Sequence, residues 1–153
     1  MPTTVTKDAL LDMAGHTSGP TDWLLVDQER VDRFADATGD HQFIHVDPVK
    51  AAHTPFGTTV AHGFLTLSLL PLLSEEIAIV PEGAAMAFNY GSNKVRYPSP
   101  VKVGSRIRLH SKILDVVDKG AGRLLVTAES TVEIEGEDKP ALVAETLTMY
   151  IVP

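Results

Sequence analysis

The segment from Gly63 to about Ile79 constrains the fold most, because "GFLTLSLLPLLSEEIAI" is apolar nearly all round. A helix of this kind has to be enclosed by other structure, and Pro71 should kink it by removing one backbone donor. After Pro81 the sequence becomes rich in Val, Ile, Leu, Thr and Tyr, with turn signals between the apolar runs. We expect an α+β fold in which an antiparallel sheet wraps around a central hydrophobic helix. The predicted strands span 84–97, 105–117, 122–135 and 140–152.

Charge and composition exclude several classes of protein. The chain has 153 residues, enough for one domain with a substantial core, and a net charge of −7. Its 13 basic residues are scattered among 20 acidic ones, so the sequence predicts no nucleic-acid partner. It has no cysteine, which excludes disulfides, zinc–thiolate sites and a thiol nucleophile.

The sequence also predicts a cytoplasmic protein without a membrane segment. The N-terminus lacks the basic start and apolar core of a secretory signal. The longest apolar run, 64–73, is interrupted by polar residues and a proline, whereas a membrane helix needs about 20 apolar residues.

A helix is predicted over 28–38, where apolar residues recur at i, i+3, i+4 and i+7. Asp27 is its predicted N-cap, and Gly39 stands where a C′ glycine ends a helix. A second helix is predicted to begin at Asp47 and Pro48, which form an N-cap and N1 pair. The seven residues between these helices are therefore expected to be a connector loop.

This connector, "DHQFIHV", carries a carboxylate and two histidines. On one continuous helix, Asp40 and His45 would lie about 140° apart, so only a folded-back loop brings them together. Phe43 and Ile44 are apolar and are predicted to anchor the loop to the core. His41 and His45 have the i, i+4 spacing of helical metal ligands, but on a loop and without a clear third ligand we expect no metal site.

Three longer motifs carry a resemblance to a known family: "TGDHQFIHVDP", "FGTTVAHGFLTLSLL" and "NYGSNKVRYPSPV". They are similar to motifs of the MaoC-like dehydratases, the (R)-specific enoyl-CoA hydratases, especially the nodulation-protein-N-like branch. The resemblance covers roughly 27–150 and implies a single hot-dog domain over 1–153. It further implies a homodimer with an acyl-CoA site at the subunit interface and no cofactor beyond the CoA thioester.

The same resemblance implies the catalytic residues. The family's catalytic Asp falls on Asp40 and its catalytic His on His45. The commoner pattern has Asn and Pro where this chain has Gln42 and Phe43, so the loop loses proline's rigidity while Gln42 keeps an amide that can contact substrate. An Asp and a His that hold one water could orient it and exchange protons with it, and either could be the base.

The start of the apolar helix is the predicted oxyanion site. Its first backbone N–H groups are unpaired and lie at the positive end of the helix dipole, which suits an enolate-like thioester oxygen. The amide of Gly63 is the candidate donor, and absence of a side chain would let the acyl group approach closely. His62 is expected either to line this pocket or to cap the helix.

Asn89, Asn93 and Arg96 lie in the third motif. They are expected either to face solvent or to contact the second subunit or the CoA phosphates. Two other functions fit the same fold. A hot-dog thioesterase usually carries its acid or nucleophile on the central helix, which here offers carboxylates only at Glu75 and Glu76, far from its start. A non-catalytic acyl-CoA-binding module is the third alternative.

Overall fold

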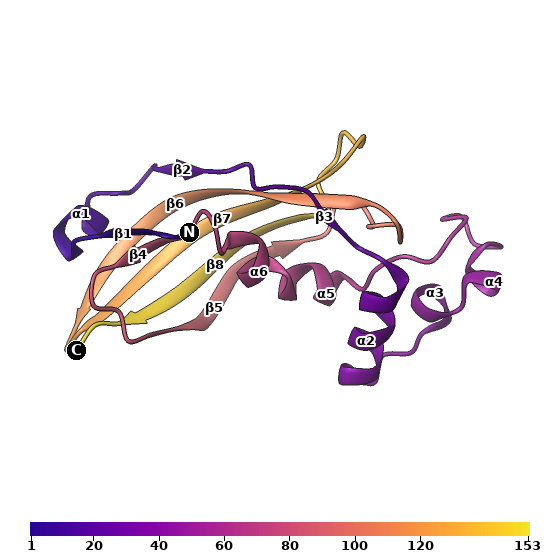
Figure 1. The fold of residues 1–153 in the computed structure, drawn as a ribbon, viewed down its shortest axis with the longest axis horizontal. Helices are drawn as coiled ribbons and strands as arrows, with labels where there is room; N and C mark the ends of the chain where they lie inside the picture. The colour runs from indigo at the N-terminus through magenta and orange to yellow at the C-terminus, as the bar shows by residue number, and fades with distance from the viewer.

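The predicted antiparallel strands are confirmed. In the computed structural model, which describes residues 1–153, one six-stranded sheet has the order β2-β6-β7-β8-β5, and β3 pairs with β6 beside β2 (Figure 1). All pairings within this sheet are antiparallel. The strands are β2 (Thr17–Ser18), β3 (Leu24–Leu25), β5 (Met86–Arg96), β6 (Arg106–Gly120), β7 (Arg123–Ile134) and β8 (Leu142–Ile151).

The apolar helix lies against this sheet, as expected, but it is broken. It consists of α5 (Gly63–Ser68) and α6 (Leu70–Ser74), with Leu69 between them. Pro71 explains the interruption, because it has no N–H to bond the carbonyl four residues earlier and its ring crowds that carbonyl. The predicted distortion at Pro71 is therefore confirmed, whereas the prediction that the helix continues to about Ile79 is wrong, because α6 ends at Ser74.

The residues predicted to end the helix form a strand instead. β4 (Ile79–Pro81) pairs in parallel with β1 (Thr3–Val5), a small second sheet that the sequence reading missed. The β-branched pair at the start of β4 favours an extended backbone once Thr3–Val5 supplies a partner strand. The short helix α1 (Lys7–Leu11) follows β1, and the fully buried Leu10 packs in a second core beneath it.

The main core lies between the broken helix and the sheet. Leu65, Leu69 and Leu73 project from successive turns of α5 and α6 onto buried residues of β6, β7 and β8. The opposite side of the helix is open, because Phe64 is 69% exposed and Leu72 is 46% exposed. The single chain therefore covers one face of the helix and leaves the other uncovered, contrary to the expectation of full enclosure. No helix is both long enough and apolar enough to cross a bilayer.

The helix predicted between Asp27 and Gly39 is confirmed as α2 (Gln28–Thr38). The Asp27 carboxylate accepts from the Arg30 N–H at 2.9 Å, and Gly39 ends the helix with a φ of 82°. In Figure 1, α2 stands beyond the end of the sheet together with two short helices.

These two helices are α3 (Phe43–Val46) and α4 (Pro48–Ala51), and the Asp47 carboxylate caps α4 through the Lys50 N–H, as predicted. The connector is therefore not a plain loop, since it contains the single helical turn α3. Phe43 is 42% exposed and does not anchor it. The buried side chain of this turn is His45. A buried imidazole needs hydrogen-bond partners, and nearby backbone groups can supply them.

An ion pair joins two neighbouring strands of the sheet at one register position. Arg108 of β6 and Glu133 of β7 are register partners, and the Arg108 Nε donates to a Glu133 carboxylate oxygen at 2.7 Å. The same oxygen lies 2.7 Å from His110 Nε2, and the Arg108 guanidinium stacks over Trp23. The hydrogen bond from Arg108 has the largest effect in holding the pKa of Glu133 below its usual value, and the hydrogen bond with His110 has the next largest.

Replacing Glu133 by Gln is expected to lower the free energy of unfolding by less than about 1 kcal/mol near neutral pH, because the pair is partly exposed and screened. A carboxylate with a lowered pKa stabilises the fold above its unfolded pKa of about 4.5 and loses that effect as the pH falls through the folded value. The wild-type and variant proteins should therefore become equally stable in acid. Urea unfolding across this pH range measures the difference, with Glu137→Gln as an unpaired control. A difference that persists in acid would contradict the assignment.

Candidate active site

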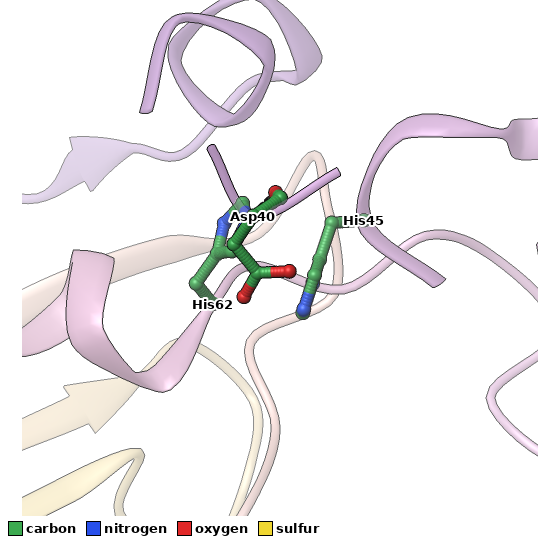
Figure 2. Close-up of side chains that lie close together, drawn as sticks. All are labelled: Asp40, His45 and His62. Atoms are coloured by element: carbon green, nitrogen blue, oxygen red, sulfur yellow. Dashed lines mark hydrogen bonds between the residues drawn. The ribbon is translucent and has the colours of Figure 1, made fainter. Parts of the chain in front are cut away.

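Three side chains from separate segments meet at the start of the broken helix. Asp40 follows α2, His45 lies in α3 and His62 immediately precedes α5. Their ligand atoms all lie within 4.8 Å of one another, and Figure 2 shows the Asp40 carboxylate directed toward the His45 ring. The structure thus brings together Asp40 and His45, as the sequence reading predicted, and adds His62 to them.

His45 is held in one tautomer. Its ring is buried, with 7% of the residue exposed, and Nδ1 lies 2.6 Å from the backbone carbonyl of Val60. A carbonyl can only accept, so Nδ1 carries the proton and donates it to this bond. In the neutral imidazole, Nε2 therefore has a free lone pair.

The backbone around His45 is fixed as firmly as its ring. The Val60 N–H donates to the Ile44 carbonyl at 2.9 Å, so both backbone groups of Val60 bind consecutive residues of α3. Gln28, the first residue of α2, donates from Nε2 to the His45 carbonyl at 2.7 Å. The buried Thr59 hydroxyl donates to the Gln28 side-chain oxygen at 2.6 Å. Gln28 and Thr59 were not identified from the sequence, because their role depends on contacts between distant segments.

Asp40 is exposed, in contrast to both histidines. Its Oδ1 accepts a long hydrogen bond of 3.3 Å from the Gln42 N–H, which uses the backbone of Gln42 rather than its amide. No direct hydrogen bond joins the carboxylate to His45. Two hydrogen bonds of about 2.8 Å meeting at one water span roughly 4.5 Å. Because the ligand atoms of the two side chains lie no more than 4.8 Å apart, one water could bridge them.

His62 is the N-cap residue of α5, one of the two roles expected for it, but it makes no side-chain cap hydrogen bond. Only 2% of the residue is exposed, and its ring is stacked on His45 with centroids 3.8 Å apart and an interplanar angle of 23°. Its Nε2 lies 3.0 Å from the Asp40 backbone carbonyl, so this nitrogen donates. Its Nδ1 is buried without a hydrogen-bond partner.

The ring geometry bears on whether these three residues could share a metal ion. Imidazole nitrogens bind zinc at about 2.0–2.1 Å through lone pairs in the ring plane, so two ring planes have to meet at the ion. The stacked rings of His45 and His62 are nearly parallel, and their planes do not converge at that distance. His41, the other histidine considered, is exposed and bonds Asp36 at 2.9 Å.

Gly63 begins α5, as predicted. A Cβ at this position would lie 3.2 Å from the ring of Tyr97, so the missing side chain also makes room for the tyrosine. Close approach of an acyl group at Gly63 stays a prediction. The N–H groups of Gly63 and Phe64 have no acceptor in the structure. Burial raises the pKa of the neighbouring Tyr97 phenol.

Comparison with known proteins places these features in a family. The model of the MaoC like domain matches residues 12–136. The chain belongs to the MaoC-like family. This MaoC-like chain is 54% identical over 138 residues to 3-hydroxyacyl-thioester dehydratase Z of Mycobacterium tuberculosis, a match that covers 90% of this chain and 91% of that one. It is 48% identical over 136 residues to nodulation protein N of Rhizobium leguminosarum bv. viciae, covering 88% and 84% respectively.

The fold of the MaoC-like chain is that of solved hot-dog proteins. An (R)-hydratase from A. caviae involved in PHA biosynthesis superimposes with a TM-score of 0.71 at 20% identity, covering 92% of this chain and 96% of that one. The expected hot-dog fold and the expected branch of the family are both confirmed.

The third motif of the MaoC-like chain meets the second through Tyr97, which lies against Gly63, whereas its predicted polar site residues lie along one strand. Asn89, Asn93 and Arg96 lie on the exposed strand β5. Asn93 donates to Glu145 at 2.9 Å, and Arg96 donates to the carbonyl of Val95. None of these bonds reaches Asp40 or His45, so a role for them in contacting the CoA phosphates or a second subunit stays a prediction.

Proposed function

We propose that this protein catalyses the reversible addition of water to trans-2-enoyl-CoA, giving (R)-3-hydroxyacyl-CoA in fatty-acid metabolism. The observation that carries the proposal is the free Nε2 lone pair of His45 on a ring that lies beside the Asp40 carboxylate, with the ligand atoms of the two residues within 4.8 Å of one another. The dehydratase and (R)-hydratase names of the relatives support the reaction class, the thioester substrate and the stereochemistry. The mechanism needs no metal or other cofactor.

The proton transfers follow from the tautomer of His45. Nε2 accepts a proton from the bridging water as its oxygen bonds to the β-carbon of the enoyl thioester. The Asp40 carboxylate accepts a hydrogen bond from the other O–H of that water, which stays on the oxygen, and so orients the water. The hydrogen bond from Nδ1 to the Val60 carbonyl becomes charge-assisted as the imidazolium forms, which stabilises it. The dyad then returns a proton to the α-carbon, and the product gains one hydroxyl and one hydrogen.

The thioester oxygen gains negative charge during this step. The unpaired N–H groups of Gly63 and Phe64 at the start of α5 are the donors proposed to stabilise it. Residues 60–62 connect the Val60 carbonyl, which holds His45, to the start of α5. This short backbone segment therefore sets the distance between the base, His45, and the donors to the thioester oxygen.

We further propose that the enzyme is a homodimer that joins two sheets at β5. This strand is an edge, paired only with β8, and its backbone groups on the other side have no partner strand. Met86, Phe88 and Tyr90 of β5 are exposed, as are Phe64 and Leu72 on the uncovered face of the broken helix. An exposed edge with apolar side chains favours pairing with a second copy, which would also cover the helix.

Tyr90→Lys is expected to shift the protein from dimer to monomer, because a charge on an edge strand opposes strand pairing. Light scattering combined with gel filtration measures the mass. Val49→Lys is the matched control, since Val49 is an apolar residue on α4 that is even more exposed than Tyr90 and lies away from the edge. A Tyr90→Lys protein that keeps twice the chain mass, or a wild-type protein with the mass of one chain, would refute this interface.

The activity itself is tested by the loss of enoyl-thioester absorbance with short- and long-chain trans-2-enoyl-CoAs, after dialysis against EDTA. We expect hydration at a rate unaffected by the chelator, and chiral chromatography should identify the (R)-3-hydroxyacyl product. A parallel thiol assay detects free CoA, which a thioesterase would release. The proposal would be overturned if no enoyl-CoA of any chain length were hydrated, or if CoA were released without hydration. Binding of enoyl-CoA without turnover would instead indicate the non-catalytic module.

A further inference from the structure

His62 occupies a place that packing alone does not explain. Its ring fills a buried slot between His45, at 3.8 Å, and Phe34, at 4.8 Å between ring centroids. A phenylalanine would fill such a slot without any buried polar atom. The imidazole instead leaves Nδ1 unpartnered, the one buried side-chain nitrogen or oxygen in the chain in this state. A buried unpaired polar group destabilises a fold, so His62 needs another reason to be a histidine.

The other ring nitrogen supplies that reason. Nε2 donates to the backbone carbonyl of Asp40, which lies just beyond the left-handed Gly39 and is otherwise exposed. No other hydrogen bond ties the Asp40 backbone to the segment that carries Gly63. The same ring contacts the face of His45. One side chain thus contacts both members of the dyad.

We propose that His62 is a positioning residue for the hydration, which holds the Asp40 carboxylate and the His45 imidazole at the spacing of one water. This inference rests on the proposed function. The hydrogen bond from Nε2–H fixes the position of the Asp40 backbone. The ring stack fixes the orientation of the His45 ring plane. Because misplacing a catalytic group by about 1 Å can lower a rate by about 10²-fold, a lost anchor should appear in kcat.

Two variants separate the two contacts. His62→Phe keeps an aromatic ring against His45 but loses the donor to Asp40, and it also removes the unpartnered nitrogen. His62→Gln loses the ring but can place an amide N–H near the position of Nε2. We expect His62→Phe to lower kcat by about 10- to 100-fold with little change in KM, while Tm stays equal to or above that of the wild type. His62→Gln should recover part of the lost kcat.

The outcomes of these assays are distinct. A His62→Phe enzyme with wild-type kcat overturns the inference, as does a loss of kcat that parallels a fall in Tm, which is what a purely structural residue would show. A His62→Gln enzyme that is no more active than His62→Phe removes the hydrogen bond from the proposal. Failure of the wild type to hydrate any enoyl thioester refutes the proposed function instead.

A spectroscopic measurement tests the contacts without activity. Long-range ¹H–¹⁵N spectra of the wild-type protein at neutral pH should show the Nδ1–H tautomer for His45 and the Nε2–H tautomer for His62. In His62→Phe, the amide resonances of the Asp40 loop should shift while the His45 tautomer is kept. Unchanged resonances in that loop, or the opposite tautomer at His62, would overturn the positioning role.

Discussion

Asp40→Asn is expected to lower kcat for enoyl-CoA hydration by about 10²- to 10⁴-fold, the range for one general acid–base group. The substitution keeps the shape of the side chain, and the Asn oxygen can still accept from the Gln42 N–H. It replaces one water-binding carboxylate oxygen by an amide nitrogen that cannot accept, so the water loses its orientation toward the β-carbon. Asp40 is exposed, and Tm should therefore change little.

The rate of loss of enoyl absorbance, measured for wild type and variant with the same substrate, gives the ratio. Asp36→Asn is the matched control, since Asp36 is an exposed carboxylate on α2 that bonds His41 and not the dyad. Equal rates in the wild-type and Asp40→Asn proteins would remove Asp40 from the mechanism.

His45→Asn is expected to lower kcat by a similar factor for a different reason. The Asn amide nitrogen lies close to where Nδ1 was and can still donate to the Val60 carbonyl, so the hydrogen bond of 2.6 Å has a replacement. What the variant lacks is Nε2, the only group in the site with a lone pair held toward the water by a fixed tautomer. Because the buried donor is kept, the loss of activity should exceed any loss of stability.

Steady-state rates and thermal unfolding of the same preparations separate the loss of activity from the loss of stability. His41→Asn serves as the control on the neighbouring exposed histidine. If His45→Asn keeps most of the wild-type rate, Asp40 rather than His45 is the base. If both dyad variants keep full biological function while hydration is absent in all proteins, the chain is a binding module.

Local signals in the sequence predicted the parts of the fold that local chemistry decides. The bounds of α2 follow from Asp27 and Gly39, and the four long strands follow from alternating side chains between turns. The failures involve partners distant in sequence. Ile79–Pro81 is a strand because Thr3–Val5 lies beside it, and no pattern within either segment indicates that pairing.

The candidate site divides in the same way. The pairing of Asp40 with His45 could be expected from the family resemblance of its motif, and the structure brings both side chains together. The hydrogen bonds that hold this pair could not be expected, although His62 itself is a predicted site residue. Gln28 and His62 act through single hydrogen bonds to carbonyls 17 and 22 residues away, and neither residue type signals such a bond in advance. Gly63 was selected correctly as a helix start, but Tyr97 beside it was not foreseen.

Val60 forms one hydrogen bond with Ile44 and one with His45, and these two bonds close the intervening residues into a loop whose ends are joined. Its ends are fixed to one another, Ala51 and Thr59 within it are buried, and its exposed residues are 48–50 of α4 and most of the tip at 52–57. Lengthening a loop whose ends are already joined costs little free energy, because the closure entropy grows only with the logarithm of its length. The tip is therefore the place where insertions or grafted sequences could reshape the approach to the site while the acid, the imidazole and the water between them stay in place.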